Sequence, residues 1–192
     1  MFANPLAPEW LDAPAEANSL PSSVWSLNSV RTKTGELAVA GVAATELVHQ
    51  FGTPVYVIDE VDAIARATEI KAAFDAAFAR IGSSVTVYYA GKAFLCTEVA
   101  RWMAAAGLNI DVASAGEMAV ALAAGVDASR LGFHGNNKSL SEIDRAVRAG
   151  IGPIVIDSVV EIGRVAEAAA RHGRTQRVRL RINSGVHAST HE

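Results

Sequence analysis

The sequence lacks several features that define other classes of protein. Its single cysteine, Cys96, excludes an intrachain disulfide and is typical of a reducing compartment. No apolar run approaches the roughly 18 residues that are needed to cross a bilayer, and the first residues do not have the charged and apolar regions of a signal peptide. We therefore expect no membrane segment and a cytoplasmic location.

Charge is also scarce. Lys and Arg number 17 against 20 Asp and Glu, the net charge is -3, and charged residues make up 19% of the chain. Because no basic run offers a contact surface for a phosphate backbone, we expect no nucleic-acid partner. The 51% hydrophobic content of these 192 residues is enough to bury a core in one or two domains.

Metal-binding motifs are missing as well. His187 and His191 are four residues apart, a spacing that would suit zinc on a helix, but Gly185 and Ser189 argue against a helix there and no H-E-x-x-H motif is present. We interpret this spacing as chance and expect no metal site.

From Thr53 onward, strand-like and helix-like segments alternate. Short runs rich in Val, Ile and Tyr predict strands at Val55–Ile58, Val85–Ala90, Asn109–Val112, Leu131–Phe133, Ile154–Ile156 and Val178–Ile182. Alanine-rich segments with one apolar face predict helices at Val61–Arg80, Thr97–Ala106, Gly116–Ala124, Leu140–Ala149 and Val159–Arg171. Strict alternation predicts an α/β fold with a parallel sheet, and the absence of G-x-G-x-x-G after the first strand argues against a dinucleotide-binding, doubly wound sheet.

Three repeated boxes reinforce the helix starts. Ser114, Ser139 and Ser158 are each followed three residues later by Glu, the pattern of a capping box in which the serine and the glutamate satisfy two free backbone amides. Glycines follow the helices, where they can end a helix in the left-handed conformation; they are Gly107, Gly125, Gly150 and Gly173. The repeated unit is therefore strand, cap, helix and glycine.

Lys92 stands at the carboxyl end of a predicted buried strand, in the run Val85-Thr-Val-Tyr-Tyr-Ala-Gly-Lys92. Folds of this class assemble their chemistry at that end, and a partly buried lysine with a lowered pKa suits Schiff-base formation with a carbonyl. The residues alone are equally compatible with a solvated lysine that opens a helix.

The segment Tyr89-Ala-Gly-Lys-Ala-Phe94, followed by Val99, Met103 and Gly107, resembles the pyridoxal-phosphate attachment signature of the ornithine/diaminopimelate/arginine decarboxylase family, the fold-type III enzymes. The resemblance extends from about Phe51 to the last residue. It implies a pyridoxal 5'-phosphate cofactor on Lys92 and an incomplete (β/α)8 TIM-type barrel over residues 51–192, with about six strands present. Residues 1–50 would be a lead-in that belongs to a β-rich second domain.

The resemblance also implies the surroundings of the cofactor. It places Asp111, at the end of the third predicted strand, near the lysine and the cofactor ring, although Asp111 could also be an acid that favours the following helix. His134 and the segment Gly135-Asn-Asn-Lys-Ser139, which is closest to the diaminopimelate decarboxylases of the family, would line the cofactor site. Arg181 would orient acidic groups there by pairing with them. Arg177 and Arg179 alternate along the same strand face, so spacing alone does not single out Arg181. Ser184 stands where the family commonly has proline.

By this resemblance the chain is the first part of a decarboxylase that converts meso-2,6-diaminopimelate, a small amino-acid substrate, to L-lysine and that forms a homodimer when full length. Such a fragment would be inactive alone. Three alternatives stay open: an ornithine or arginine decarboxylase, a non-catalytic pyridoxal-phosphate-binding barrel, and an aldolase-like barrel with a Schiff-base lysine and no cofactor.

Overall fold

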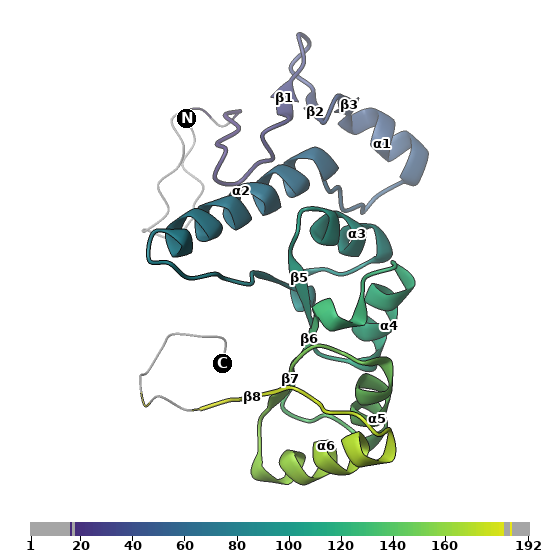
Figure 1. Ribbon diagram of the computed structural model, residues 1–192. Coiled ribbons are helices and arrows are strands. Elements are labelled where there is room, and N and C mark those ends of the chain that lie inside the picture. Colours follow the sequence, from purple (N-terminus) through teal and green to yellow (C-terminus); the bar gives the residue numbers. More distant parts are fainter. Residues whose placement is uncertain (1–15, 17, 183–184, 186–192) are drawn as a thin grey trace. The chain divides into compact units, whose positions relative to one another are not determined.

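A computed structural model describes residue 16, residues 18–182 and residue 185. The chain divides into two compact units, Met1–Ala63 and Ile64–Glu192, which we treat separately (Figure 1). His187, His191 and Ser184, which the sequence analysis discussed, lie outside the described residues.

The described part of the first unit contains a small antiparallel sheet. Its strands are β1 (Ser29–Arg31), β2 (Leu37–Val39) and β3 (Val42–Ala43), and they pair in that order. Ala40 and Gly41, both with positive φ, form the two-residue turn between β2 and β3. Helix α1 (Ala44–Phe51) follows, and helix α2 (Glu60–Ala79) runs from the first unit into the second.

The described part of the second unit is built on a parallel sheet of five strands. They are β4 (Tyr88–Ala90), β5 (Asn109–Val112), β6 (Leu131–Phe133), β7 (Ile154–Ile156) and β8 (Val178–Leu180), and their order in the sheet is their order in the chain (Figure 1). The intervening helices are α3 (Thr97–Ala105), α4 (Ala115–Ala123), α5 (Leu140–Ala149) and α6 (Val159–Arg171), with short 3-10 turns η1 (Gly91–Ala93) and η2 (Ala128–Arg130). A strand order that never reverses is that of a (β/α) barrel, because a doubly wound sheet changes direction at a switch point.

The two faces of this sheet differ in chemistry. Alternate residues of β5, β6 and β7 are apolar, almost fully buried and covered by the helices; they are Ile110, Val112, Leu131, Phe133, Ile154 and Ile156. The register pairs Asp111 with Gly132, and Val155 with Arg179, on the other face. The polar side chains of the strands therefore gather on the face that the helices do not cover.

A contact between the two outermost strands shows that the sheet curves strongly. The Arg179 Cζ lies 4.9 Å from the centre of the Tyr88 ring, and the Arg179 Nη2 donates to the Tyr88 hydroxyl oxygen at 3.3 Å. In a flat sheet, four strand spacings of about 4.8 Å would hold β4 and β8 roughly 19 Å apart, too far for these side chains to stack. Gly132 lies between them, and a Cβ there would come within 3.1 Å of the Tyr88 ring. The curvature confirms the prediction of an incomplete barrel.

The five predicted helices are confirmed to within one residue; the predicted Val178–Ile182 strand ends at Leu180, and two other strand predictions need a larger correction. Val55–Ile58 is not a strand, and Tyr56 within it is almost fully exposed. The predicted Val85–Ala90 strand is reduced to Tyr88–Ala90. A β-strand requires hydrogen bonds from a neighbouring strand, and β-branched residues alone do not provide them.

The three predicted capping boxes have three different outcomes. Ser139 and Glu142 form the complete box at the start of α5. Ser114 accepts from the Glu117 amide, but the Glu117 carboxylate accepts from the Ala113 amide and not from that of Ser114. Ser158 makes no side-chain cap, because the Glu161 amide donates to the Ser158 carbonyl oxygen at 3.1 Å; the buried Glu161 carboxylate accepts from Lys138 and from the Asp157 amide. Thr45, in the first turn of α1, bonds to Glu36 and does not cap the helix.

Gly152 and Gly163 provide a test of the packing. A Cβ on Gly152 would lie 2.5 Å from the Leu131 carbonyl oxygen and 2.6 Å from that of Ser129, whereas a Cβ on Gly163, inside α6, would meet nothing within 4 Å. We expect Gly152→Ala to destabilise the full-length protein that contains this chain by about 1 to 3 kcal/mol, because backbone must move. Gly163→Ala, the control, should stabilise the protein by about 0.5 to 1 kcal/mol through helix propensity. Denaturant unfolding measures both, and a Gly152→Ala protein as stable as the wild type would contradict the packing described here.

Candidate functional site

The carboxyl ends of β4, β5 and β6 meet at a cavity of about 160 Å³. Three of the four predicted site residues line it, namely Lys92, Asp111 and His134, together with Ala90, Gly91, Val112 and Ala113. Each comes from a different strand end, so residues that are up to 42 positions apart in the sequence (92 to 134) share one small volume. The structure thus brings these three side chains together, as the carboxyl end of a parallel sheet should.

Lys92 is positioned by a tight turn. It lies in η1 directly after β4, and a Cβ on the preceding Gly91 would come within 2.7 Å of the Asp111 carbonyl oxygen. The Tyr89 hydroxyl donates to the Phe94 carbonyl oxygen at 2.6 Å and closes the turn from the other side. The backbone that carries Lys92 can therefore approach β5 only because residue 91 is glycine.

The expected partial burial of Lys92 is not observed. Its side chain is exposed. The other described lysines of the second unit are engaged in ion pairs: Lys71 with Asp75 and Lys138 with Glu161. Within the described residues of this unit, Lys92 is the lysine that lines the cavity, and its charge acts on Asp111.

Asp111 and His134 face each other across the cavity floor, with 3.0 Å between the Asp111 Oδ1 and the His134 Nε2. Burial raises the pKa of Asp111 above its ordinary value, and the charges of His134, Arg179 and Lys92 and a hydrogen bond from His134 offset part of this rise. Gly132 makes room for the pair, since a Cβ there would lie 2.5 Å from the Asp111 Oδ1. The acid and the imidazole thus hold each other in a fixed orientation.

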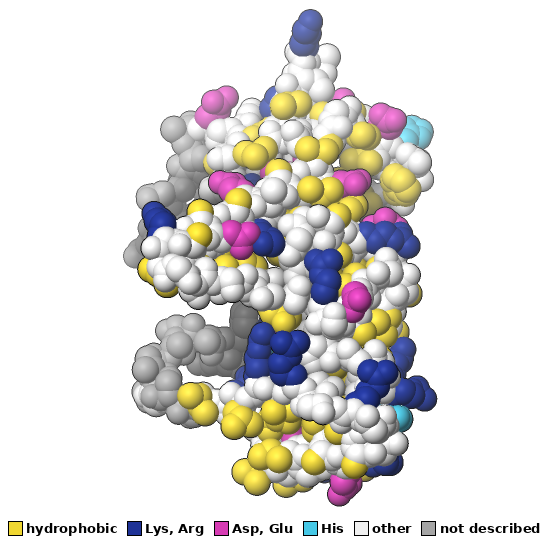
Figure 2. Space-filling view, in the orientation of Figure 1, with side chains coloured by type: hydrophobic (Ala, Val, Ile, Leu, Met, Phe, Trp, Pro, Cys, Tyr) yellow, Lys and Arg dark blue, Asp and Glu magenta, His cyan; other side chains and the backbone are white. Residues whose placement is uncertain are grey.

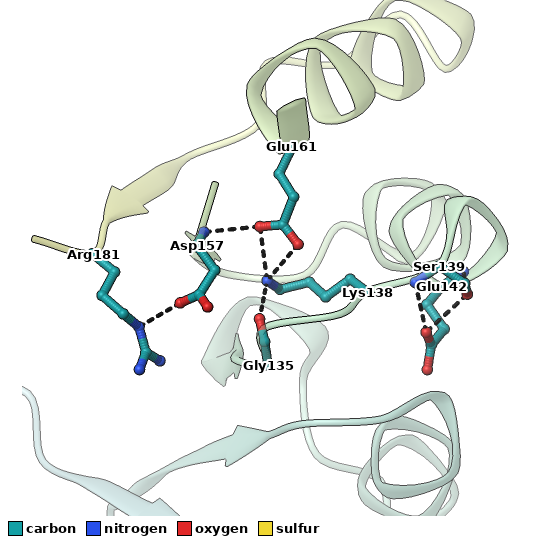
Figure 3. Close-up of polar contacts among 7 residues, drawn as sticks. All are labelled: Gly135, Lys138, Ser139, Glu142, Asp157, Glu161 and Arg181. Atoms are coloured by element: carbon teal, nitrogen blue, oxygen red, sulfur yellow. Dashed lines mark hydrogen bonds and ion pairs between the residues drawn. The ribbon is translucent and has the colours of Figure 1, made fainter. Parts of the chain in front are cut away.

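Arg181 is not among the residues that line the cavity. Its Nε lies 2.5 Å from the Asp157 Oδ1, at the end of β7, and its side chain is 55% exposed (Figure 3). Arg181 does pair with an acid, but that acid, Asp157, is not one of the predicted site residues. Arg179, one alternation earlier, is the arginine whose charge acts on Asp111.

The sequence did not point to Tyr88 or Asp157, and it named Arg179 only as sharing the alternation of Arg181. The alternation of residues 177, 179 and 181 was a usable signal, since it puts all three on one face of a strand. The alternation does not show which of these three arginines lies beside Asp111, because that depends on the register between strands.

No group of three or more His, Cys, Asp or Glu side chains among the described residues could hold a metal ion. None of the helices in this described part of the chain is both long enough and apolar enough to cross a membrane.

Comparison with known proteins identifies the family to which this chain belongs. The sequence profile of the family described as "Pyridoxal-dependent decarboxylase, pyridoxal binding domain" matches residues 65–192. The chain belongs to this family. Its cofactor is therefore pyridoxal phosphate, and the attachment signature around Lys92 lies inside the matched region.

Curated relatives of this decarboxylase family give the same result over a longer span. The chain is 47% identical over 173 residues to the diaminopimelate decarboxylase of Mycobacterium tuberculosis, covering 90% of the chain and 37% of the relative. It is 39% identical over 164 residues to that of Bacillus subtilis, covering 85% of the chain and 36% of the relative. The chain thus spans little more than a third of the length of these relatives.

Solved structures of the family share the fold. The diaminopimelate decarboxylase from M. jannaschi matches with a TM-score of 0.74 and 31% identity, over 86% of this chain and 38% of that one. The enzyme from Helicobacter pylori, complexed with L-lysine, matches with a TM-score of 0.66 and 31% identity, over 77% of this chain and 36% of that one. These neighbours confirm the predicted fold class.

The described residues fit the family's cofactor. Pyridoxal phosphate needs an accessible lysine amine, and Lys92 offers one at the cavity. An aromatic ring with polar substituents also needs hydrogen-bonding partners at its edge, and the Asp111–His134 pair borders the same cavity.

The raised pKa of Asp111 leads to a pH-dependent prediction. Between the ordinary and the raised value, the folded protein holds this proton more tightly than the unfolded chain does, so Asp111 makes the protein less stable as the pH rises through that window. Asp111→Asn cannot ionise and should become more stable relative to the wild type over the same rise. Denaturant unfolding at a series of pH values measures the difference.

Asp127→Asn is the control for this prediction. Hydrogen bonds from Ser129 lower the pKa of the exposed Asp127, so its contribution to stability is present above the ordinary value and is lost as the pH falls through the lowered one. The two variants should therefore differ in the sign of their pH dependence. The same sign for both would contradict the burial of the Asp111 charge.

Proposed function

We propose that this chain is the N-terminal part of a pyridoxal-phosphate-dependent decarboxylase that converts meso-2,6-diaminopimelate to L-lysine. The observation that carries the proposal is the 47% identity to a diaminopimelate decarboxylase over 90% of the chain. The clustering of Lys92, Asp111 and His134 around one cavity supports it, because the shared sequence then includes a constellation able to bind and orient a substrate.

In this proposal Lys92 holds the cofactor covalently through its Nζ. A lysine amine bonds to a carbonyl carbon only in its neutral form, and it must leave again when the amine of the substrate takes its place. The flexible, exposed side chain of Lys92 suits that exchange better than Lys138, whose amine is buried in an ion pair.

Asp111 and His134 would orient the reacting groups. The His134 Nε2 lies 3.0 Å from the Asp111 Oδ1, and this contact would restrict the orientation of the imidazole ring beside the cavity. Bound pyridoxal phosphate would supply the electron sink for the charge left when carbon dioxide departs. The role of this chain's residues is to fix the geometry in which that bond breaks.

Arg181 has a different proposed role from Asp111 and His134. Its guanidinium pairs with Asp157 at the end of β7, next to β8, and would hold that part of the site's rim in place. We propose it as a residue that supports the cofactor site from the side.

The proposal extends to domains and assembly. Residues 1–50 would belong to a β-rich domain, which the antiparallel sheet of β1, β2 and β3 supports, and residues 51–192 would form the first part of the pyridoxal-phosphate-binding barrel. The full-length protein would be a cytoplasmic homodimer.

Substrate choice is tested by measuring carbon dioxide release from three amino acids. The full-length protein that contains this chain should decarboxylate meso-diaminopimelate with a higher kcat/KM than ornithine or arginine. A preference for ornithine or arginine would contradict the proposed substrate but would leave the assignment to the decarboxylase family unchanged. Release from none of them, with cofactor bound, would indicate a non-catalytic pyridoxal-phosphate protein.

Borohydride reduction of the same full-length protein should fix the pyridoxyl group on Lys92. Peptide mapping by mass spectrometry locates the label, and Lys92→Ala should abolish it. The matched control is Lys71→Ala, which removes a partly exposed lysine on α2 and should leave labelling unchanged. A label on Lys71 or Lys138 would overturn the assignment.

The 192-residue chain by itself should not decarboxylate any substrate. Strand β8 is exposed along its length, and a groove of about 380 Å³ beside it is lined by apolar side chains of α6, β7 and β8, among them Ile156, Ile162, Val165, Val178 and Leu180. Figure 2 shows hydrophobic side chains gathered over α6, at the foot of the view. We expect aggregation, or a loosely packed state with helical circular dichroism and dye-binding apolar surface. A soluble, cooperatively unfolding chain that releases carbon dioxide would refute this.

A further inference from the structure

A buried ion pair lies behind the cavity and takes no part in the chemistry proposed above. The side chains of Lys138 and Glu161 are 1% and 4% exposed, and the Lys138 Nζ lies 3.2 Å and 3.1 Å from the two Glu161 carboxylate oxygens (Figure 3). Lys138 also donates to the Gly135 carbonyl oxygen, and Glu161 accepts from the Asp157 amide at 2.8 Å. The pair therefore joins the loop after β6 to the turn after β7.

Stability alone does not account for this pair. Burying two charges costs several kcal/mol per ion before their attraction is counted, and apolar replacements of buried pairs are often neutral or stabilising. The Glu161 carboxylate accepts from Lys138 and from the Asp157 amide, so it does not complete the expected capping box of α6. What the pair does provide is a fixed distance between two loops.

One of these loops carries His134. Lys138 reaches back over three residues to the carbonyl of Gly135, the residue directly after His134. Gly135 has a φ of 112°, and a Cβ there would lie 3.2 Å from the carbonyl oxygen of Ala113, which lines the cavity. The backbone at residue 135 is thus held against β5 on one side and by the lysine on the other, which restricts the directions open to the His134 side chain.

We propose that the Lys138–Glu161 pair is a positioning device that sets the His134 ring against Asp111. The expected effect on catalysis rests on the proposed function, whereas the placement of the His134 ring does not. Lys138 and Glu161 are positioning residues in this proposal and do not touch the reacting atoms.

The variant that tests it is K138M/E161Q. Removing Lys138 alone would leave a buried, unpaired carboxylate and could unfold the protein. The double variant has no charge to bury, and its glutamine oxygen can still accept from the Asp157 amide, so the fold should persist. What is lost is the link from residue 138 to the Gly135 carbonyl.

The first readout uses the full-length protein without cofactor. NMR of the His134 ring protons at one fixed pH should show a changed chemical shift in K138M/E161Q. His172 is an internal reference in the same spectrum, because its Nε2 lies 3.0 Å from the Asp144 Oδ1 in a separate cluster, and its signal should not move. Unchanged signals for both histidines would overturn the proposal.

The second readout is activity of the cofactor-loaded protein. We expect kcat/KM to fall by about 10²-fold in K138M/E161Q, as for a misplacement of about 1 Å, with little change in melting temperature. In an Asp111→Asn background the same double change should have a much smaller effect, because the ring then has no carboxylate to face. Equal effects in both backgrounds would mean that the pair does not act through His134 and Asp111.

The matched control is K71M/D75N, which removes the Lys71–Asp75 ion pair on α2. It should leave kcat/KM and the His134 signal as they are in the wild type. A wild-type protein that decarboxylates nothing would refute the proposed function, while the His134 signal would still decide whether the pair positions the ring.

Discussion

The structure of the second unit depends on the burial of one face of its parallel sheet. Helices cover alternate residues of β5, β6 and β7, and Ile110, Leu131 and Phe133 are fully buried beneath them. Since side chains alternate along a strand, this burial sends Asp111 and Arg179 to the opposite face. A one-residue slip would put charges into the core, so the hydrophobic effect fixes the register and, with it, the site.

Small residues decide how closely the parts of the site can approach. Gly91 lets the turn that carries Lys92 lie against the Asp111 carbonyl, and Gly132 leaves room for Asp111 below the Tyr88 ring. Gly135 brings the His134 loop over Ala113 in the same way. Gly91 after β4, Gly132 within β6 and Gly135 after β6 thus let these segments approach closely enough for Lys92, Asp111 and His134 to line one cavity.

The sequence predicted the helices well and the contacts of individual glutamates poorly. Alanine-rich amphipathic segments determine a helix locally, and all five predicted helices from Val61 onward are present. Glu142, Glu117 and Glu161 stand in the same S-x-x-E pattern, yet only Glu142 completes a box. Glu161 is bonded to Lys138, which is 23 residues away, and no local pattern indicates such a partner. The same limit applies to Arg179 and Arg181, which the alternation could not separate.

The sequence by itself determined the order of strands and helices, the position of Lys92 at a strand end and the family signature around it, because these depend on neighbouring residues. Tertiary structure alone decided that Val55–Ile58 is not a strand, that Lys92 is exposed, that Arg181 pairs with Asp157 and that Lys138 is buried against Glu161. Two of these outcomes depend on a partner from another part of the chain, Asp157 for Arg181 and Glu161 for Lys138. The other two depend on the absence of such a partner among the described residues. Strand pairing, burial and ion pairing are properties of two segments together, and the residues of one segment do not specify them.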